Sequence, residues 1–112
     1  MINIDSSCNI EMTRGDSLIL ELSLCKNGEA YIPEAGDVIR FAMARTYKDV
    51  NGYELLLSKV INHDDMLLRL DPQDTASLPY GKYVYDLQIT YTDGTVETFA
   101  NKKQIRLTEE VE

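Results

Sequence analysis

The residues with metal-binding chemistry stand together in one short stretch of the sequence, His63-Asp64-Asp65. An imidazole and two carboxylates are ligand types that divalent cations use. Consecutive residues on a tight turn rarely converge on one ion, however, and the sequence holds a single histidine. The stretch is therefore interpreted as a polar turn between strands, and no metal is predicted.

A second acidic stretch superficially resembles a calcium-binding loop and comprises Asp49, Asn51, Gly52 and Glu54. The EF-hand loop needs its invariant glycine at the sixth position. Gly52 comes two positions too early for that pattern. The stretch is therefore interpreted as a turn.

Arg14-Gly15-Asp16 is the tripeptide that integrins recognise. Gly15 also suits a turn between two strands, with Arg14 and Asp16 solvated on either side. Because tripeptides recur by chance, the turn is the preferred interpretation.

Catalytic groups in a recognisable arrangement are missing from the sequence. The single histidine lies in a predicted turn, no serine has the glycine context of a nucleophile elbow, and no glycine-rich loop could cradle a phosphate. We therefore predict a protein that is not an enzyme and uses no cofactor. Tyr31, Tyr53 and Tyr80 lie near predicted loops and are candidate contacts for a sugar or a protein, although partial burial at the loop bases is the simpler interpretation.

Length and charge limit the classes of partner. A chain of 112 residues suits one domain, 1–112, built on one core. A formal net charge of -8 argues against a general grip on nucleic acid and against an anionic membrane surface. The N-terminus has neither the basic start nor the apolar run of a signal peptide, and no apolar run reaches membrane-spanning length.

The two cysteines, Cys8 and Cys25, are predicted to remain free thiols. If the strands on either side of Arg14-Gly15 form a hairpin, Cys8 lies opposite about Glu21 and is out of register with Cys25. Cytosolic thiols also stay reduced.

The elements that position these residues are predicted to be β-strands, and the clearest pair of strands lies within 78–99. Large side chains recur there at every second residue, namely Tyr83, Tyr85, Leu87, Ile89 and Tyr91. Such alternation is typical of a half-buried strand. Asp93-Gly94 then suits the short loop of a hairpin.

Shorter segments before this hairpin show similar patterns. Strands are predicted over 9–13, 17–25, 30–32, 37–45, 54–61 and 66–70. The segment 54–61 is apolar on both faces and could be helical, but turn signals bound it and it is shorter than a typical helix. Asn27-Gly28 predicts a further hairpin turn.

One helical turn is predicted after residue 70. Asp71 can cap it, Pro72 suits the first helical position, and Asp74 would lie in the first turn, where the helix dipole favours an anion. The turn should end near Leu78-Pro79, with Leu78 pointing into the core.

The register of the return strand after residue 94 is informative. A two-residue loop would point even-numbered residues such as Ala100 inward, whereas the later apolar residues Ile105 and Leu107 are odd-numbered. Because a slip of one residue turns every side chain to the other face, this register predicts a bulge within 101–103. A three-residue loop is the alternative, which would bring Phe99 inward without a bulge.

About seven or eight short strands, with one short helical turn ahead of the penultimate strand, predict an all-β fold of the immunoglobulin-like antiparallel β-sandwich type. In such folds a tyrosine near the start of the penultimate strand ties the corner through a backbone hydrogen bond. Tyr83 is predicted to play this part.

Three segments carry a family resemblance, and they are MTRGDSLILELSL, DVIRFAMAR and LRLDPQDTASLPYGKYVYDLQITYTDGTVETF. Together they resemble small bacteriophage and prophage structural proteins with an immunoglobulin-like β-sandwich, notably the amino-terminal domain of baseplate upper proteins. The resemblance implies a virion module of the tail or baseplate that docks to other phage structural proteins and often forms homo-oligomers. Baseplate upper proteins usually continue into a receptor-binding part, so we do not expect receptor binding from these residues themselves.

The leading hypothesis is thus a non-enzymatic phage or prophage structural protein that acts through protein–protein contacts. Its expected location is the virion, or the bacterial cytoplasm when it is expressed from a prophage. Its expected partners are other phage structural proteins and further copies of itself, without nucleic acid or membrane. The alternative hypothesis is a small carbohydrate-binding or adhesion module that uses loop tyrosines such as Tyr53 and Tyr80.

Overall fold

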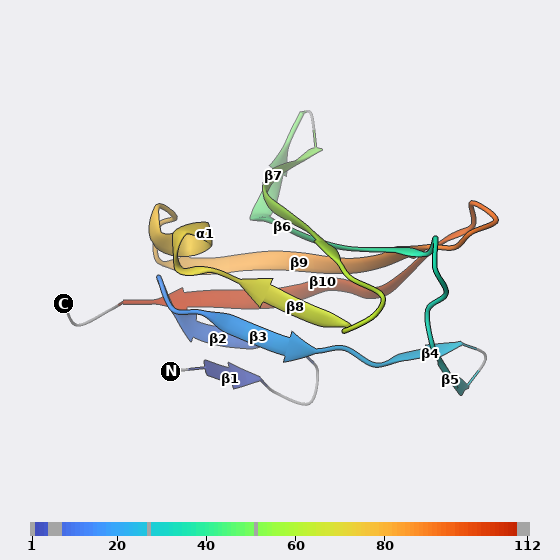
Figure 1. The fold of residues 1–112 in the computed structure, drawn as a ribbon. Coiled ribbons are helices and arrows are strands. Elements are labelled where there is room, and N and C mark those ends of the chain that lie inside the picture. The colour runs from blue at the N-terminus through green and yellow to red at the C-terminus, as the bar shows by residue number, and fades with distance from the viewer. Residues whose placement is uncertain (1, 5–7, 27, 51, 110–112) are drawn as a thin grey trace.

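The computed structural model describes residues 2–4, 8–26, 28–50 and 52–109. Nearly all of the regular structure in these residues is β-strand, which confirms the predicted all-β class (Figure 1). The bounds of the elements are β1 (Ile2–Ile4), β2 (Ile10–Thr13), β3 (Leu18–Glu21), β4 (Leu24–Lys26), β5 (Glu29–Tyr31), β6 (Val38–Asp49), β7 (Gly52–Ile61), β8 (Leu67–Leu70), α1 (Pro72–Ala76), β9 (Gly81–Thr90) and β10 (Val96–Thr108).

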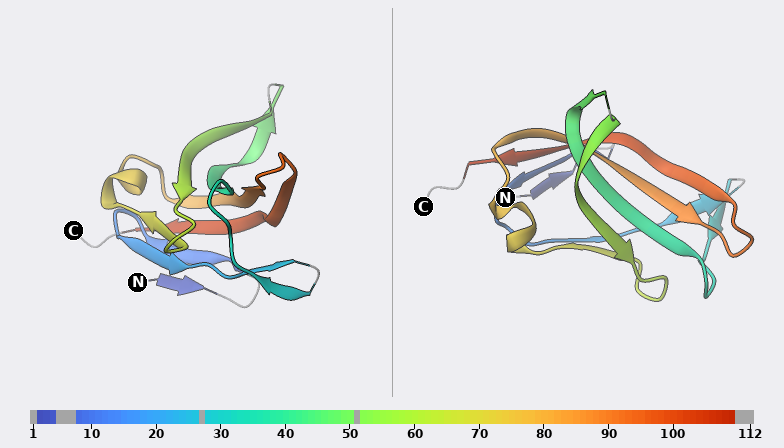
Figure 2. Two further views of the ribbon diagram at one scale, coloured as in Figure 1. Left: turned by 45° about the vertical axis from the view of Figure 1, so that its right-hand side comes forward. Right: turned by 90° about the horizontal axis from the view of Figure 1, so that it is seen from above.

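Two layers enclose the core. The main sheet has the strand order β1-β2-β10-β9-β6-β7, and a second sheet pairs β3 with β8. Seen from above, β3 and β8 form one layer and β9 and β10 the other, while β6 and β7 curve from the main sheet toward β8 (Figure 2). The neighbours β6-β9-β10 and β3-β8 correspond to the C-F-G and B-E neighbours of immunoglobulin domains.

The alternating side chains of β9 and β6 build the centre of the core. Tyr83, Tyr85, Leu87 and Ile89 are all buried, as their spacing predicted. The neighbouring strand β6 contributes Ile39, Phe41 and Met43, which are fully buried. Opposite them, β3 and β8 point Leu18, Leu68 and Leu70 into the same core. Burying one face of each strand is what holds the two layers together.

The strands on either side of Arg14-Gly15 do not form a hairpin with each other, which was the condition considered for the register of Cys8. Strand β2 pairs with β1 and, in parallel, with β10, whereas β3 pairs with β8. The turn therefore carries the chain from the main sheet to the second sheet. This crossing lets Met12 and Leu18 face the core from opposite layers, so that both apolar faces are buried.

The number of strands exceeds the predicted seven or eight, since the described residues contain ten. The additional strands come from β1, which was not predicted, and from the long segment 17–25. That segment divides into β3 and β4 around Leu22 and Ser23, because β4 turns away to form a hairpin with β5. Asn27 of the predicted hairpin turn lies outside the described residues.

The β9–β10 hairpin has a three-residue loop. Tyr91 N donates to Thr95 O at 2.8 Å, and Val96 pairs with Thr90. The two-residue loop was therefore wrong. Phe99 packs half-buried against the core, as the three-residue alternative predicted.

A bulge is present nevertheless. The register shifts on either side of Ala100, and the second shift falls where 101–103 was predicted to bulge. Lys102 adopts a φ of 51° there, which few residues other than glycine favour. These two shifts bring both Ala100 and Ile105 to the buried side of β10.

The helical corner forms as predicted. Asp71 precedes α1, and its N–H donates to Asp74 Oδ2 at 2.7 Å. Leu78 is half-buried against the core. The Tyr83 hydroxyl donates to the Pro79 carbonyl oxygen at 2.5 Å, which confirms the predicted tyrosine corner.

Candidate interaction surface

Tyr31, at the end of β5, is engaged within the fold. Its hydroxyl donates to Asp37 Oδ2 at 2.6 Å, and its ring meets the edge of the Tyr91 ring at 5.6 Å between centroids. The hydrogen bond to the Asp37 carboxylate raises the pKa of Tyr31 to about 12. Asp37 is itself buried and also accepts from the Glu34 and Thr92 backbones. Tyr31 thus fastens β5 to the loop before β6.

Tyr80, beyond α1, is also engaged. The Arg14 guanidinium lies 4.1 Å from the centroid of its ring, and Arg14 Nη2 donates to the Tyr80 hydroxyl oxygen at 2.9 Å. Arg14 Nη1 reaches the Leu78 carbonyl oxygen at 3.2 Å, and Gly15 N donates to Thr75 Oγ1 at 2.9 Å. The Arg14-Gly15-Asp16 turn is therefore a structural part of the α1 corner, in line with its interpretation as a turn.

His63-Asp64-Asp65 forms the predicted polar turn between β7 and β8. His63 Nε2 lies 3.1 Å from Asp64 Oδ1, while Asp65 Oδ1 accepts from the Leu67 backbone at 3.0 Å. Within the described ranges, no three His, Cys, Asp or Glu side chains gather as metal ligands would. Among the described residues Cys8 and Cys25 are both exposed free thiols.

In the other acidic stretch, Asp49 ends β6 and Gly52 begins β7, while Glu54 lies within β7. Gly52 adopts a φ of 98°, as a turn residue often does. Asn51 lies outside the described residues.

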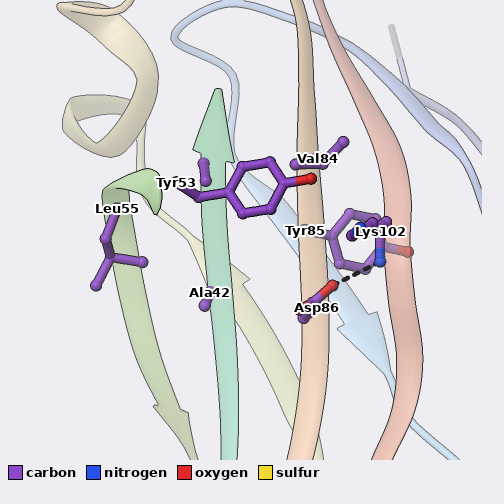
Figure 3. A pocket seen from close by; sticks show the side chains of 8 residues that line it. Ala42, Tyr53, Leu55, Val84, Tyr85, Asp86 and Lys102 are labelled. Atoms are coloured by element: carbon purple, nitrogen blue, oxygen red, sulfur yellow. Dashed lines mark hydrogen bonds between the residues drawn. The ribbon is translucent and has the colours of Figure 1, made fainter. Parts of the chain in front are cut away.

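Tyr53, in β7, borders a hollow on the side of the main sheet that faces away from β3 and β8 (Figure 3). The hollow has a volume of about 160 Å³, and its floor is formed by the small side chains of Ala42, Ala44 and Val84. Leu55 lies at the same hollow, so its lining is largely apolar. The three candidate tyrosines therefore do not form one site, because Tyr31 and Tyr80 are engaged elsewhere.

Strand register explains which side chains share this side of the sheet, which we call the outer face. Ala42 pairs with Asp86 and Ala44 with Val84, between the buried residues of β6 and β9. Small apolar residues thus occupy the positions of β6 and β9 that alternate with the core residues and face away from the second sheet. The sequence pattern did not single out this face, because the buried half of each alternation carries the distinctive large apolar residues.

Basic side chains surround the hollow on the outer face, and the exposed ones are Arg40, Lys82, Lys102 and Arg106. The register places Arg40 opposite Gln88 and Lys82 opposite Arg106, on the same side as Ala42. Lys102 Nζ lies 5.5 Å from the centroid of the Tyr53 ring. The Lys102 N–H donates to Asp86 Oδ1, which joins the β10 bulge to the floor of the hollow.

The tips of β6 and β7 extend the surface as a hairpin that projects from the body (Figure 1). The pairing of β6 with β9 ends at Arg45 and Tyr83, so beyond Arg45 the described part of β6 pairs with β7 alone. Arg45 Nε donates to Glu54 Oε2 at 3.0 Å, and this bond raises the pKa of Arg45. Tyr47 and Val50 at the tip are 66% and 100% exposed.

No protein-family model matches this sequence, and comparison with curated proteins and with solved structures also yields no match. In the described part of the chain, no helix is long and apolar enough to span a membrane. The outer face and its hairpin therefore define the candidate site from the structure alone. Chemically they offer an apolar hollow, an aromatic edge and a rim of cations.

Proposed function

We propose that the protein is a non-enzymatic phage or prophage structural protein, of the tail or baseplate type, that acts through protein–protein contacts. The observation that supports contact with protein is the outer face, where an apolar hollow is surrounded by basic side chains and flanked by a projecting hairpin. Protein interfaces commonly combine an apolar centre with a polar rim. A rigid sheet also holds such a surface in one shape, so little ordering entropy is lost on docking.

The phage assignment rests on the resemblance of the segments around 12–24, 37–45 and 68–99 to the amino-terminal domain of baseplate upper proteins. Those segments supply β2, β3, β6 and β9 together with the helical corner. The corresponding partners are other phage structural proteins and further copies of this chain. The corresponding location is the virion, or the bacterial cytoplasm during expression from a prophage.

Binding to the proteins encoded by neighbouring genes tests this function. We expect one of them to bind the purified protein in a stoichiometric complex, measured by calorimetry. Ala42→Glu would fill the hollow with a longer, charged side chain and should weaken binding at least about tenfold, because an apolar group of the partner would lose its place and burying a charge is costly. Ile19→Glu, on the exposed side of β3, is the matched control and should bind normally.

The proposal would be overturned if the protein remained a strict monomer and bound none of these gene products. If the Ala42→Glu variant bound the neighbouring gene product as tightly as the wild type does, the outer face would not be the binding surface. Circular dichroism and thermal unfolding of each variant would establish that it is folded.

A carbohydrate-binding or adhesion module is the second candidate. One observation favours it, because the Tyr53 ring and the Asp86 carboxylate border the same hollow, and sugars are often held by aromatic stacking and carboxylate hydrogen bonds. A glycan array would test it with Tyr53→Ala and Tyr80→Ala. Saturable binding that only Tyr53→Ala abolishes would favour this candidate, since the Tyr80 ring already contacts Arg14.

A further inference from the structure

Charge is unevenly distributed over this acidic protein, and the outer face carries an excess of cations. Arg40, Lys82, Lys102 and Arg106 are exposed there. Two carboxylates share the face: Asp86, whose Oδ1 accepts from the Lys102 backbone, and Glu11, whose Oε2 lies 3.5 Å from Arg106 Nη1. The face is therefore net positive in a chain whose formal charge is -8.

The loops at the end of the molecule opposite α1 have the opposite character, and we call them the acidic end. Glu34 follows β5, and Asp64 and Asp65 lie in the turn between β7 and β8; all three are exposed. Ile32 and Asp64 border one surface hollow, which places these loops side by side. Figure 1 shows β4 and β5 at the far end of the sheets from α1.

An apolar residue projects from the acidic end. Ile32 is 85% exposed, although isoleucine is usually buried. Pro33, which follows it, is buried and anchors the loop. The acidic end thus presents the exposed apolar side chain of Ile32 beside carboxylates, while the outer face presents an apolar hollow among cations.

We propose that the outer face of one copy binds the acidic end of a second copy, with Ile32 seated in the hollow formed by Ala42, Ala44 and Val84. Opposite charges surround the apolar contact on both sides, which favours this orientation over others. The two surfaces differ, so the contact is heterologous. In an open chain of copies, one terminal copy keeps an unbound outer face and the other keeps an unbound acidic end. Repeated contacts of this kind build a closed ring or a filament. The inference rests on the proposed structural function and identifies its partner as this chain.

Two charge-reversed variants test the contact by sedimentation velocity. Arg40→Glu alters the outer face alone, and Glu34→Lys/Asp64→Lys alters the acidic end alone. We expect each variant by itself to self-associate at least about tenfold more weakly than the wild type, because each places like charges against each other. An equimolar mixture should associate again, since each variant retains the surface that the other lacks.

Two single variants complete the test. Ile32→Ser should weaken self-association at least about tenfold, because it removes the side chain that fills the hollow. Ile19→Glu is the control, because it adds a negative charge on the exposed side of β3, outside the residues that form either surface, and it should associate like the wild type.

A wild-type protein that stays monomeric, a mixture that fails to associate, or equal effects of Arg40→Glu and Ile19→Glu would each overturn the inference. Binding of a DNA duplex by the wild type that Arg40→Glu abolishes, without self-association, would overturn it too. If the wild type is monomeric but binds a neighbouring gene product, the proposed function stands and only the self-contact fails.

Discussion

The α1 corner and the tip of the β6–β7 hairpin look alike in their exposed aromatic residues but differ in how those residues are engaged. Tyr80 at the corner and Tyr53 near the tip are 44% and 41% exposed. At the corner, hydrogen bonds join Arg14 to Tyr80 and Gly15 to Thr75, across the two layers. Beyond Arg45 the described part of β6 pairs with β7 alone, and Tyr53 meets the body through Lys102, whose Nζ lies 5.5 Å from the centroid of its ring.

The comparison shows that similar exposure does not indicate similar function. The corner uses its polar groups to fasten the connections between the sheets, so substitutions there should reduce stability. The tip and the neighbouring hollow leave apolar surface uncovered, so substitutions there should affect binding and leave stability unchanged.

The largest difference is expected between Tyr83→Ala and Tyr53→Ala. Tyr83→Ala removes a buried ring and its bond to the Pro79 carbonyl, and should lower the free energy of unfolding by about 3–5 kcal/mol. Tyr53→Ala should lower it by less than about 1 kcal/mol, because the ring is partly solvated. Urea denaturation measures both, and similar losses for the two variants would contradict the separation.

The next largest change in the free energy of unfolding is expected at Thr75, which is fully buried at the corner. Thr75→Val keeps the shape of the side chain but leaves the Gly15 N–H without its acceptor, which should cost about 1–3 kcal/mol of stability. Thr98→Val, at an exposed position of β10, is the matched control and should change stability by less than about 0.5 kcal/mol. Equal unfolding free energies for Thr75→Val and the wild type would show that the hydrogen bond does not stabilise the corner.

A third prediction uses pH to probe Tyr31, whose pKa is raised to about 12 by its bond to Asp37. The pKa is higher in the folded protein than the ordinary value near 10, so folding favours the neutral phenol. Its contribution to stability should be complete below about pH 10 and should be lost as pH rises toward 12. The Tyr31→Phe variant should lose less stability than the wild type does as the pH rises from about 10 to about 12.

Chemical denaturation at several alkaline pH values measures this difference. Tyr83 and Tyr91 also have raised pKa values, through burial and through a hydrogen bond to Glu97, so part of the pH dependence should remain in Tyr31→Phe. Identical pH dependence in the variant and the wild type would contradict the role of the Tyr31 bond.

The smallest effect is expected at the hairpin tip. Val50 is completely exposed, so Val50→Ser should change the free energy of unfolding by less than about 0.5 kcal/mol. Thermal unfolding followed by circular dichroism would measure it. A loss above about 1 kcal/mol would mean that the tip packs against the body and would weaken the contrast with the corner.

Much of the local structure followed from short-range patterns. The alternation in 83–91 and in 37–45 predicted which residues of β9 and β6 are buried, and Asp71-Pro72 predicted the start of α1. These predictions succeeded because side-chain period and helix capping act over a few residues. The tyrosine corner was also predictable, since Tyr83 bonds to a carbonyl only four residues away.

Features that depend on distant partners were predicted less well. Glycine at residue 15 indicated a turn, but it did not reveal that β2 would join β10 in parallel and β3 would join β8. The candidate tyrosines lie near predicted loops, but Tyr31 is engaged by Asp37 and Tyr80 by Arg14. The outer face was missed because small and basic residues in strands give no distinctive local pattern.

The sequence by itself thus determined where strands, turns and the helical corner form, and which side of the main strands is apolar. The tertiary structure decided which strands meet, which tyrosines remain available, and that Ala42, Val84 and Lys102 surround one hollow. The physical reason is that an alternating strand can pair with many others of the same period. The choice among them depends on burying every apolar face at once, across contacts far apart in the chain.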